Sequence, residues 1–123
     1  MPRFAILRHH PGPSSTRPLH WDLMFECGDV LRTFACSQEP TTGQSLSAEQ
    51  LEDHRLHYLD YEGPVSCGRG DVSRWDFGDY DVLEEWPRHW LIDLRGQRCN
   101  GQVQFTAVDD HRWMITFDEP VAD

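Results

Sequence analysis

The segment from Leu19 to Glu26 alternates two kinds of side chain, and this pattern constrains the fold more than any other part of the chain. Apolar residues occupy every second position, at Trp21, Leu23 and Phe25. Because successive side chains of a β-strand point to opposite faces, the segment predicts a strand with one face toward a core. His20 and Asp22 share the other face, and an imidazole beside a carboxylate on a rigid strand is the start of a metal site.

A second segment, from Glu52 to Tyr58, carries further polar groups that can serve the same site. It supplies His54 and Tyr58, whose ring nitrogen and hydroxyl can reach a group held by the first strand. A histidine and an aspartate on one face of a sheet also form ordinary hydrogen-bonded pairs, so the residues alone leave both interpretations open.

The rest of the chain predicts a mostly β domain built from short strands and turns. Strands are expected over residues 4–8, 30–36, 72–75, 80–84, 90–94, 102–108 and 113–117. Gly28, Gly78-Asp79 and Asn100-Gly101 mark turns, and the last two are hairpin signals. Ser47 and Gln50 match a capping box and predict a short helix that ends near residue 53. Residues 1–123 are therefore expected to form one domain, an antiparallel barrel or sandwich.

Charge and composition narrow the function classes. The net charge is -10, and all 11 basic residues other than histidine are arginine. Nucleic-acid binding usually depends on a basic surface, although the local arrangement of charge matters more than the sum. No apolar segment is long enough to span a membrane and no secretion signal is present, so we expect a cytoplasmic protein without a membrane partner.

Cysteines and tryptophans are expected to be structural. Cys27, Cys36, Cys67 and Cys99 contain no C-x-x-C pair and are expected to be reduced and mostly buried. Four tryptophans are expected in the core, namely Trp75, Trp86, Trp90 and Trp113.

Several motifs, in order, resemble a known family. They are the strand ending at His9, the segment Leu19–Glu26 with the Gly28-Asp29-Val30-Leu31 hairpin, the segment Glu52–Tyr58 followed by Tyr61-Glu62-Gly63, and Trp75-Asp76-Phe77-Gly78. Together they are similar to the 3′-phosphoesterase domain of bacterial DNA ligase D and to small stand-alone proteins that share this domain.

This resemblance implies a fold, a cofactor and a set of site residues. The fold would be a compact antiparallel β-barrel with at most one or two short helices. A manganese ion would be bound by His9, His20 and Asp22, and zinc or another divalent metal fits the same ligands. His10 follows His9 directly, and the strand phase favours His9. His54 and Tyr58 would contact the scissile phosphate of a nucleic-acid 3′ end and act in catalysis.

Three positions differ from the family pattern and bear on activity. A phosphate-binding arginine of the family is replaced by Met24, a lysine by Gln38, and a second arginine falls at Leu46. Arg17, in an enlarged loop, or Arg69 would then supply the missing positive charge.

The expected function is therefore a divalent-metal-dependent phosphoesterase that removes a 3′-phosphate or 3′-ribonucleotide in DNA repair. The expected partners are nucleic-acid 3′ ends, bound weakly, and a separate ligase or polymerase. One alternative is a catalytically weak or inactive relative that binds metal, phosphate or nucleic-acid ends. Another is a non-haem iron oxygenase, which also uses two histidines and one carboxylate.

Overall fold

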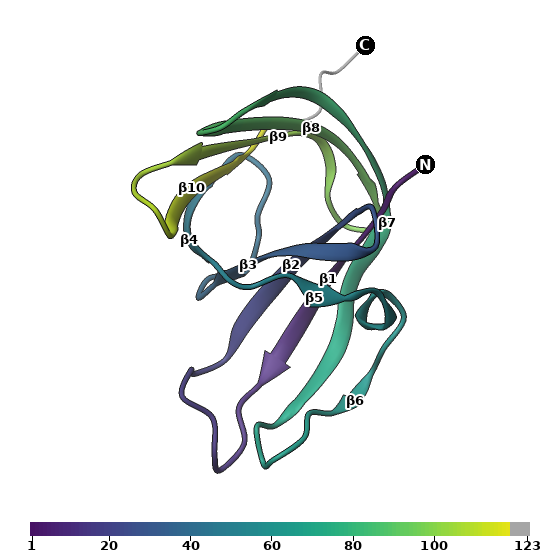
Figure 1. The fold of residues 1–123 in the computed structure, drawn as a ribbon, viewed down its shortest axis with the longest axis vertical. Helices are drawn as coiled ribbons and strands as arrows, with labels where there is room; N and C mark the ends of the chain where they lie inside the picture. Colours follow the sequence, from purple (N-terminus) through teal and green to yellow (C-terminus); the bar gives the residue numbers. More distant parts are fainter. Residues whose placement is uncertain (119–123) are drawn as a thin grey trace.

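The computed structural model describes residues 1–118, which form a closed antiparallel barrel of eight strands (Figure 1). The order around the barrel is β1-β2-β3-β4-β10-β9-β8-β7, and pairing between β7 and β1 closes it. These strands are β1 (Arg3–His10), β2 (His20–Cys27), β3 (Val30–Cys36), β4 (Ser45–Gln50), β7 (Asp71–Trp86), β8 (His89–Gly96), β9 (Asn100–Ala107) and β10 (Arg112–Phe117). The predicted fold class, a β-barrel, is confirmed.

A short segment crosses the outside of the barrel. It contains β5 (His54–Arg55), which pairs with β3, the 3₁₀ helix η1 (Leu56–Leu59), and β6 (Gly63–Pro64), which pairs with β7. Figure 1 shows β1, β2 and the first part of β7 extending beyond the rest of the barrel, with β5, η1 and β6 beside this extension. No helix of residues 1–118 has the length and hydropathy needed to cross a membrane.

The two faces of β2 enter two different apolar clusters. The barrel interior is filled by one cluster that includes Trp21, Leu23 and Phe25. A smaller cluster lies outside the barrel wall, where Met24 and Leu7 pack beneath residues of η1 and its flanks. The predicted alternation is therefore correct, and it directs His20 and Asp22 outward, toward the segment that covers the wall.

The helix predicted from Ser47 is wrong. Residues 45–50 form β4, which pairs with β10 on one side and with β3 on the other. Leu46 and Ala48 are buried in the barrel interior, whereas Ser47 and Glu49 point outward. Two neighbouring strands and a period of two outweigh the local capping pattern.

The hairpin predicted at Gly78-Asp79 is also wrong, because β7 continues through both residues. Gly78 pairs with Phe4 on one side and with Gly96 on the other, so β7 belongs to two strand pairs at this point. A Cβ atom at Gly78 would overlap the carbonyl group of Arg95. Here glycine permits close approach of two strands and does not mark a turn.

The hairpin predicted near Asn100-Gly101 exists, although its connection lies at residues 97–99. This connection is held by Asp76 of β7, a fully buried carboxylate. Asp76 Oδ1 accepts hydrogen bonds from the backbone N–H groups of Gln97 (2.7 Å) and Arg98 (3.1 Å), and Oδ2 accepts one from Cys99 (2.9 Å). The carboxylate thus supplies the acceptors that a tight turn would otherwise provide.

Two of the expectations on buried residues need correction. Trp90 and Trp113 are buried and Trp75 packs against the interior cluster, but Trp86 is 65% exposed near the end of β7. All four cysteines are free, with Cys36 and Cys99 buried and Cys27 and Cys67 exposed. Trp86 and Cys27 lie at strand ends, where alternation carries little information about burial.

Replacing Asp76 should destabilise the fold. Asp76→Ala would leave several backbone N–H groups without acceptors, and each charged hydrogen bond contributes about 1.5–3 kcal/mol, so we expect a loss of at least about 3 kcal/mol. Denaturant unfolding measures this change. Asp81→Ala is the control, because Asp81 is a partly exposed residue of the same strand whose carboxylate pairs with Arg95; an equal loss in both variants would contradict the role given to Asp76.

Candidate metal centre

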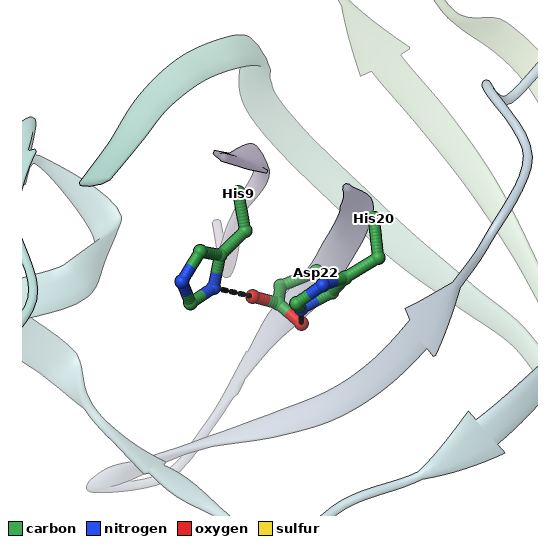
Figure 2. Close-up of side chains that lie close together, drawn as sticks. All are labelled: His9, His20 and Asp22. Carbon is green, nitrogen blue, oxygen red and sulfur yellow. Dashed lines mark ion pairs between the residues drawn. The ribbon is translucent and has the colours of Figure 1, made fainter. Parts of the chain in front are cut away.

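Strand pairing brings three potential metal ligands together. His9 of β1 lies directly opposite His20 of β2, and Asp22 is the next residue on the same face of β2. One ligand atom from each of the three residues lies within 4.8 Å of the other two. Figure 2 shows the two imidazoles on either side of the Asp22 carboxylate. His10 is exposed and outside this group, so the structure places His9 in it, as predicted.

Both imidazoles use one nitrogen to bind a backbone carbonyl. Nε2 of His9 lies 2.8 Å from the carbonyl oxygen of Arg69, and Nδ1 of His20 lies 3.0 Å from that of Pro18. A carbonyl oxygen only accepts hydrogen bonds, so these nitrogens carry the proton. In the neutral ring, the other nitrogen then presents a lone pair.

Both lone pairs face the Asp22 carboxylate. Nδ1 of His9 lies 3.4 Å from Oδ2, and Nε2 of His20 lies 3.1 Å from Oδ1. Asp22 Oδ1 is buried and accepts no well-oriented hydrogen bond from residues 1–118. Three electron-pair donors with no hydrogen between them repel one another, and a cation, either a proton or a metal ion, removes this repulsion. Histidines fixed by carbonyl groups are the usual ligands of such a metal ion.

The electrostatics of Asp22 agree with a site for a cation. Burial acts to raise the pKa of this carboxyl group, but imidazoles that take up a proton at His20 and His9 donate hydrogen bonds to it and carry positive charge, which together outweigh burial and lower its pKa to about 2. The Asp22 carboxylate in turn raises the pKa of His9. Asp22 is therefore ionised at neutral pH, as a ligand must be.

The remaining predicted site residues surround the same cavity. His54 and Tyr58 line it with the three ligands, and their rings are 5.8 Å apart between centroids. Nδ1 of His54 lies 2.8 Å from the carbonyl oxygen of Glu52, which leaves its Nε2 for another contact. The structure thus brings together all five residues predicted for metal binding and catalysis.

Arg17 and Arg69 also line the cavity, and each is held by a neighbour. Arg17 Nη1 lies 2.8 Å from Glu49 Oε2, and both side chains are partly exposed. Arg69 donates from Nε to the carbonyl oxygen of Ser66 (2.9 Å) and from Nη2 to its hydroxyl (3.0 Å). Both guanidinium groups have spare N–H donors.

The three departures from the family pattern have different structural meanings. Met24 lines the cavity on the same face as Asp22 and is almost fully buried, so an apolar group lies where a cation was expected. Leu46 points into the barrel interior, so a side chain at this position does not face the cavity. Gln38 is exposed in the loop after β3.

Comparison with known proteins gives the family. The DNA ligase D 3′-phosphoesterase domain model matches residues 9–108. The chain belongs to this family.

Relatives within the family are large proteins. The chain is 31% identical over 120 residues to the multifunctional non-homologous end joining DNA repair protein LigD of Mycobacterium tuberculosis (strain H37Rv), with 90% of the chain covered. It is 29% identical over 128 residues to the multifunctional non-homologous end joining protein LigD of Mycolicibacterium smegmatis, with 91% covered. The corresponding protein of Pseudomonas aeruginosa is 31% identical over 109 residues. The chain spans 15%, 16% and 13% of these relatives, respectively.

Several groups at the site were not foreseen from the sequence. The carbonyl groups of Pro18, Glu52 and Arg69 fix the three histidines, and Glu49 holds Arg17. A carbonyl group is present at every residue and gives no sequence signal. The sequence predicts a helix at Glu49, whereas the register of β4 turns this side chain toward the site.

Metal binding should depend on His9, His20 and Asp22 and not on the adjacent His10. We expect His9→Ala, His20→Ala and Asp22→Asn each to weaken Mn²⁺ binding at least about tenfold, because each removes one of three donors. Isothermal titration calorimetry measures the affinity. His10→Ala is the matched control and should bind like the unchanged protein; loss of binding in this variant, with retention in His9→Ala, would show that the wrong histidine was assigned.

Proposed function

We propose that this protein is a divalent-metal-dependent phosphoesterase that acts on nucleic-acid 3′ ends and removes a 3′-phosphate or a 3′-ribonucleotide. One observation carries the proposal: two imidazole lone pairs and a carboxylate converge on a cavity that His54 and Tyr58 also line. Membership of a 3′-phosphoesterase family supports the same reaction. Manganese is the metal we propose, with zinc as the alternative.

The ligand group has the composition that the reaction needs. His9, His20 and Asp22 would hold the ion and leave coordination positions open. A divalent ion bound there supplies Lewis acidity, which polarises a phosphoryl oxygen and offsets the charge that develops on it.

His54 and Tyr58 would act on the phosphate from the covering segment. In hydrolysis of a 3′-phosphate, the oxygen of a water molecule bonds to phosphorus while the bond from phosphorus to the 3′-oxygen breaks. With Nδ1 engaged by the Glu52 carbonyl group, a protonated His54 can donate its Nε2 proton to the leaving 3′-oxygen, and inorganic phosphate is released. The Tyr58 hydroxyl can donate a hydrogen bond that orients the phosphate. The ring of Tyr58 is positioned by packing against His57, with centroids 4.1 Å apart, and by the outer apolar cluster.

Arg17 and Arg69 would replace the charge that Met24 lacks. Both line the cavity, and their present partners are a partly exposed carboxylate and a serine, which exchange readily for a phosphate. Guanidinium groups bind phosphate in bidentate fashion.

A binding module is the second candidate function. Met24 favours it, because a buried thioether at the cavity wall gives no charge to a transition state. The protein would then bind a metal ion and a nucleic-acid end but would not hydrolyse the end. A separate ligase or polymerase would act on the bound end in either case.

A strand-end assay tests the proposed reaction. We expect the protein with Mn²⁺ to convert a labelled primer–template that ends in a 3′-phosphate or a 3′-ribonucleotide into one that ends in a 3′-hydroxyl. Asp22→Ala and His54→Ala should lose at least about a hundredfold in rate, since one removes a ligand and the other a proton donor. No conversion by folded, metal-loaded protein would reject the phosphoesterase and leave the binding module.

Loss of either arginine should weaken phosphate recognition. A charge-assisted hydrogen bond contributes about 1.5–3 kcal/mol, so Arg17→Ala or Arg69→Ala should lower kcat/KM roughly tenfold to 150-fold and weaken inhibition by inorganic phosphate. Arg98→Ala is the control, because Arg98 is an arginine that contacts the Trp75 ring and is not among the residues that line the cavity. Unchanged kinetics in both Arg17→Ala and Arg69→Ala would show that neither replaces the missing cation.

A further inference from the structure

A second hollow adjoins the metal centre on the outer face of the barrel. It is lined by Arg17 and His20, which also line the cavity of the metal centre, and by residues of three strands and their flanks that include Ser37, Ser47, Glu49 and Arg112. Arg17 therefore lies between the two hollows. The two hollows share these two lining residues, and we refer to them together as the groove, from the candidate metal ligands to Arg112.

Strand register sets the direction and length of this groove. Asp22 pairs with Ala35 of β3, Ala35 pairs with Glu49 of β4, and Glu49 pairs with Arg112 of β10. These four residues form one row across the outer face of the sheet. Three strand spacings separate Asp22 from Arg112, a distance of about 14 Å along the sheet. Ala35 has a small side chain, so nothing large separates the Asp22 end of the row from the Glu49 end.

The other side of the metal centre is closed. Residues of η1 and its flanks, among them Leu56, Tyr58 and Val65, pack over the outer face of β1, β2 and β7. Two arginines on that side, Arg3 and Arg74, both lie near the Asp60 carboxylate, at 2.6 and 3.8 Å. A chain that ends at the candidate ligands can leave through the second hollow, over β3, β4 and β10.

Basic side chains lie along that exit, together with the carboxylates of Glu49 and of Asp109, which accepts hydrogen bonds from the backbone N–H groups of His111 (2.9 Å) and Arg112 (2.8 Å). Arg17, His111 and Arg112 all lie close enough to Glu49 to lower its pKa. Among residues 1–118, Glu49 is the sole carboxylate that lines the second hollow. Within the part of the chain that the structure describes, no carboxylate oxygen lies within 4.0 Å of the Arg112 guanidinium. Serine hydroxyls at positions 37 and 47 add neutral hydrogen-bonding groups.

We propose that this groove binds the sugar–phosphate backbone of the nucleic-acid strand whose 3′ end lies at the metal centre, with Arg112 contacting a phosphate upstream of that end. The inference rests on the proposed function, since it takes the occupant of the metal centre to be a strand end. Arg17 exchanges Glu49 for phosphate when the strand enters, and Glu49 opposes binding. A groove of about 14 Å accommodates about four stacked nucleotides, because stacked bases advance about 3.4 Å each.

Binding of single strands by length tests the groove without any need for turnover. The probes are labelled oligonucleotides of two, four and eight nucleotides that end in a 3′-hydroxyl, measured by fluorescence anisotropy with Mn²⁺ over a range of salt. We expect affinity to rise from two to four nucleotides and to rise much less from four to eight. DNA and RNA strands are compared, because the shared phosphate backbone makes both candidates.

Variants on the row sharpen the test. Arg112→Ala should weaken the octanucleotide more than the dinucleotide and reduce the slope of log affinity against log salt by about 0.7, the value for one phosphate contact on a single strand. Glu49→Gln should raise affinity severalfold. Arg98→Ala should leave the salt slope unchanged. All three positions are exposed, so folding should be retained in each variant.

The outcomes separate this inference from the phosphoesterase reaction. Affinity that does not change from two to eight nucleotides, no detectable binding, or an Arg112→Ala slope equal to that of Arg98→Ala would overturn the groove, even if 3′-phosphates are hydrolysed. Length-dependent binding with the expected change of slope, in a protein that hydrolyses no 3′ end, would support the groove and reject the phosphoesterase.

Discussion

The register of β2 is the constraint on which both the barrel and the metal centre depend. The Phe25 ring packs among five others, with centroid distances of 5.2–6.3 Å to Phe4, Phe34, Tyr80, Trp90 and Phe105. A shift of β2 by one residue would exchange its two faces, expelling this ring and burying the Asp22 carboxylate in the aromatic interior. The aromatic core therefore determines which side chains reach the metal centre, although none of its rings lines the cavity.

Two loops supply the backbone carbonyl groups that bind one ring nitrogen each of His9 and His20, and they thereby fix which nitrogen carries the proton. The loop before β2 and the loop before β7 are joined by hydrogen bonds from Ser14 N to the Gly68 carbonyl (2.8 Å) and from Ser15 Oγ to the Arg69 carbonyl (2.9 Å). Gly70 has a φ of +93°, and a Cβ atom there would overlap the His10 carbonyl. This close packing holds the Arg69 carbonyl against His9, so a change in a loop glycine would alter the donor atoms of the metal centre.

The sequence predicted those features that local pattern or motif order determines. Alternation placed His20 and Asp22 on one face of a strand, and the order of the family motifs located His9, His54 and Tyr58, which the structure brings around one cavity. The failures occur where distant strands decide. Ser47 and Gln50 look like a helix start until β3 and β10 pair with them, and Gly78 looks like a turn until Gly96 and Phe4 are opposite it. Asp76 belongs to a family motif, yet its contacts show a structural role that the motif alone does not reveal.

The net charge of -10 is a poor guide to the electrostatics of this metal centre, because charge acts locally. Part of the acidity lies on β7 and β8, where Arg95 binds Asp79 and Asp81 at 2.6 and 2.9 Å. At physiological salt the Debye length is about 8 Å, so exposed charges farther away are largely screened. With a divalent ion bound as proposed, the ion, Arg69 and Arg112 would outweigh Asp22 and Asp109, while Arg17 and Glu49 cancel. A strand end bound as proposed would lie close to Arg17, Arg69 and Arg112, which line the two hollows. The local charge, and not the net charge of the chain, therefore decides whether the proposed ligand is attracted.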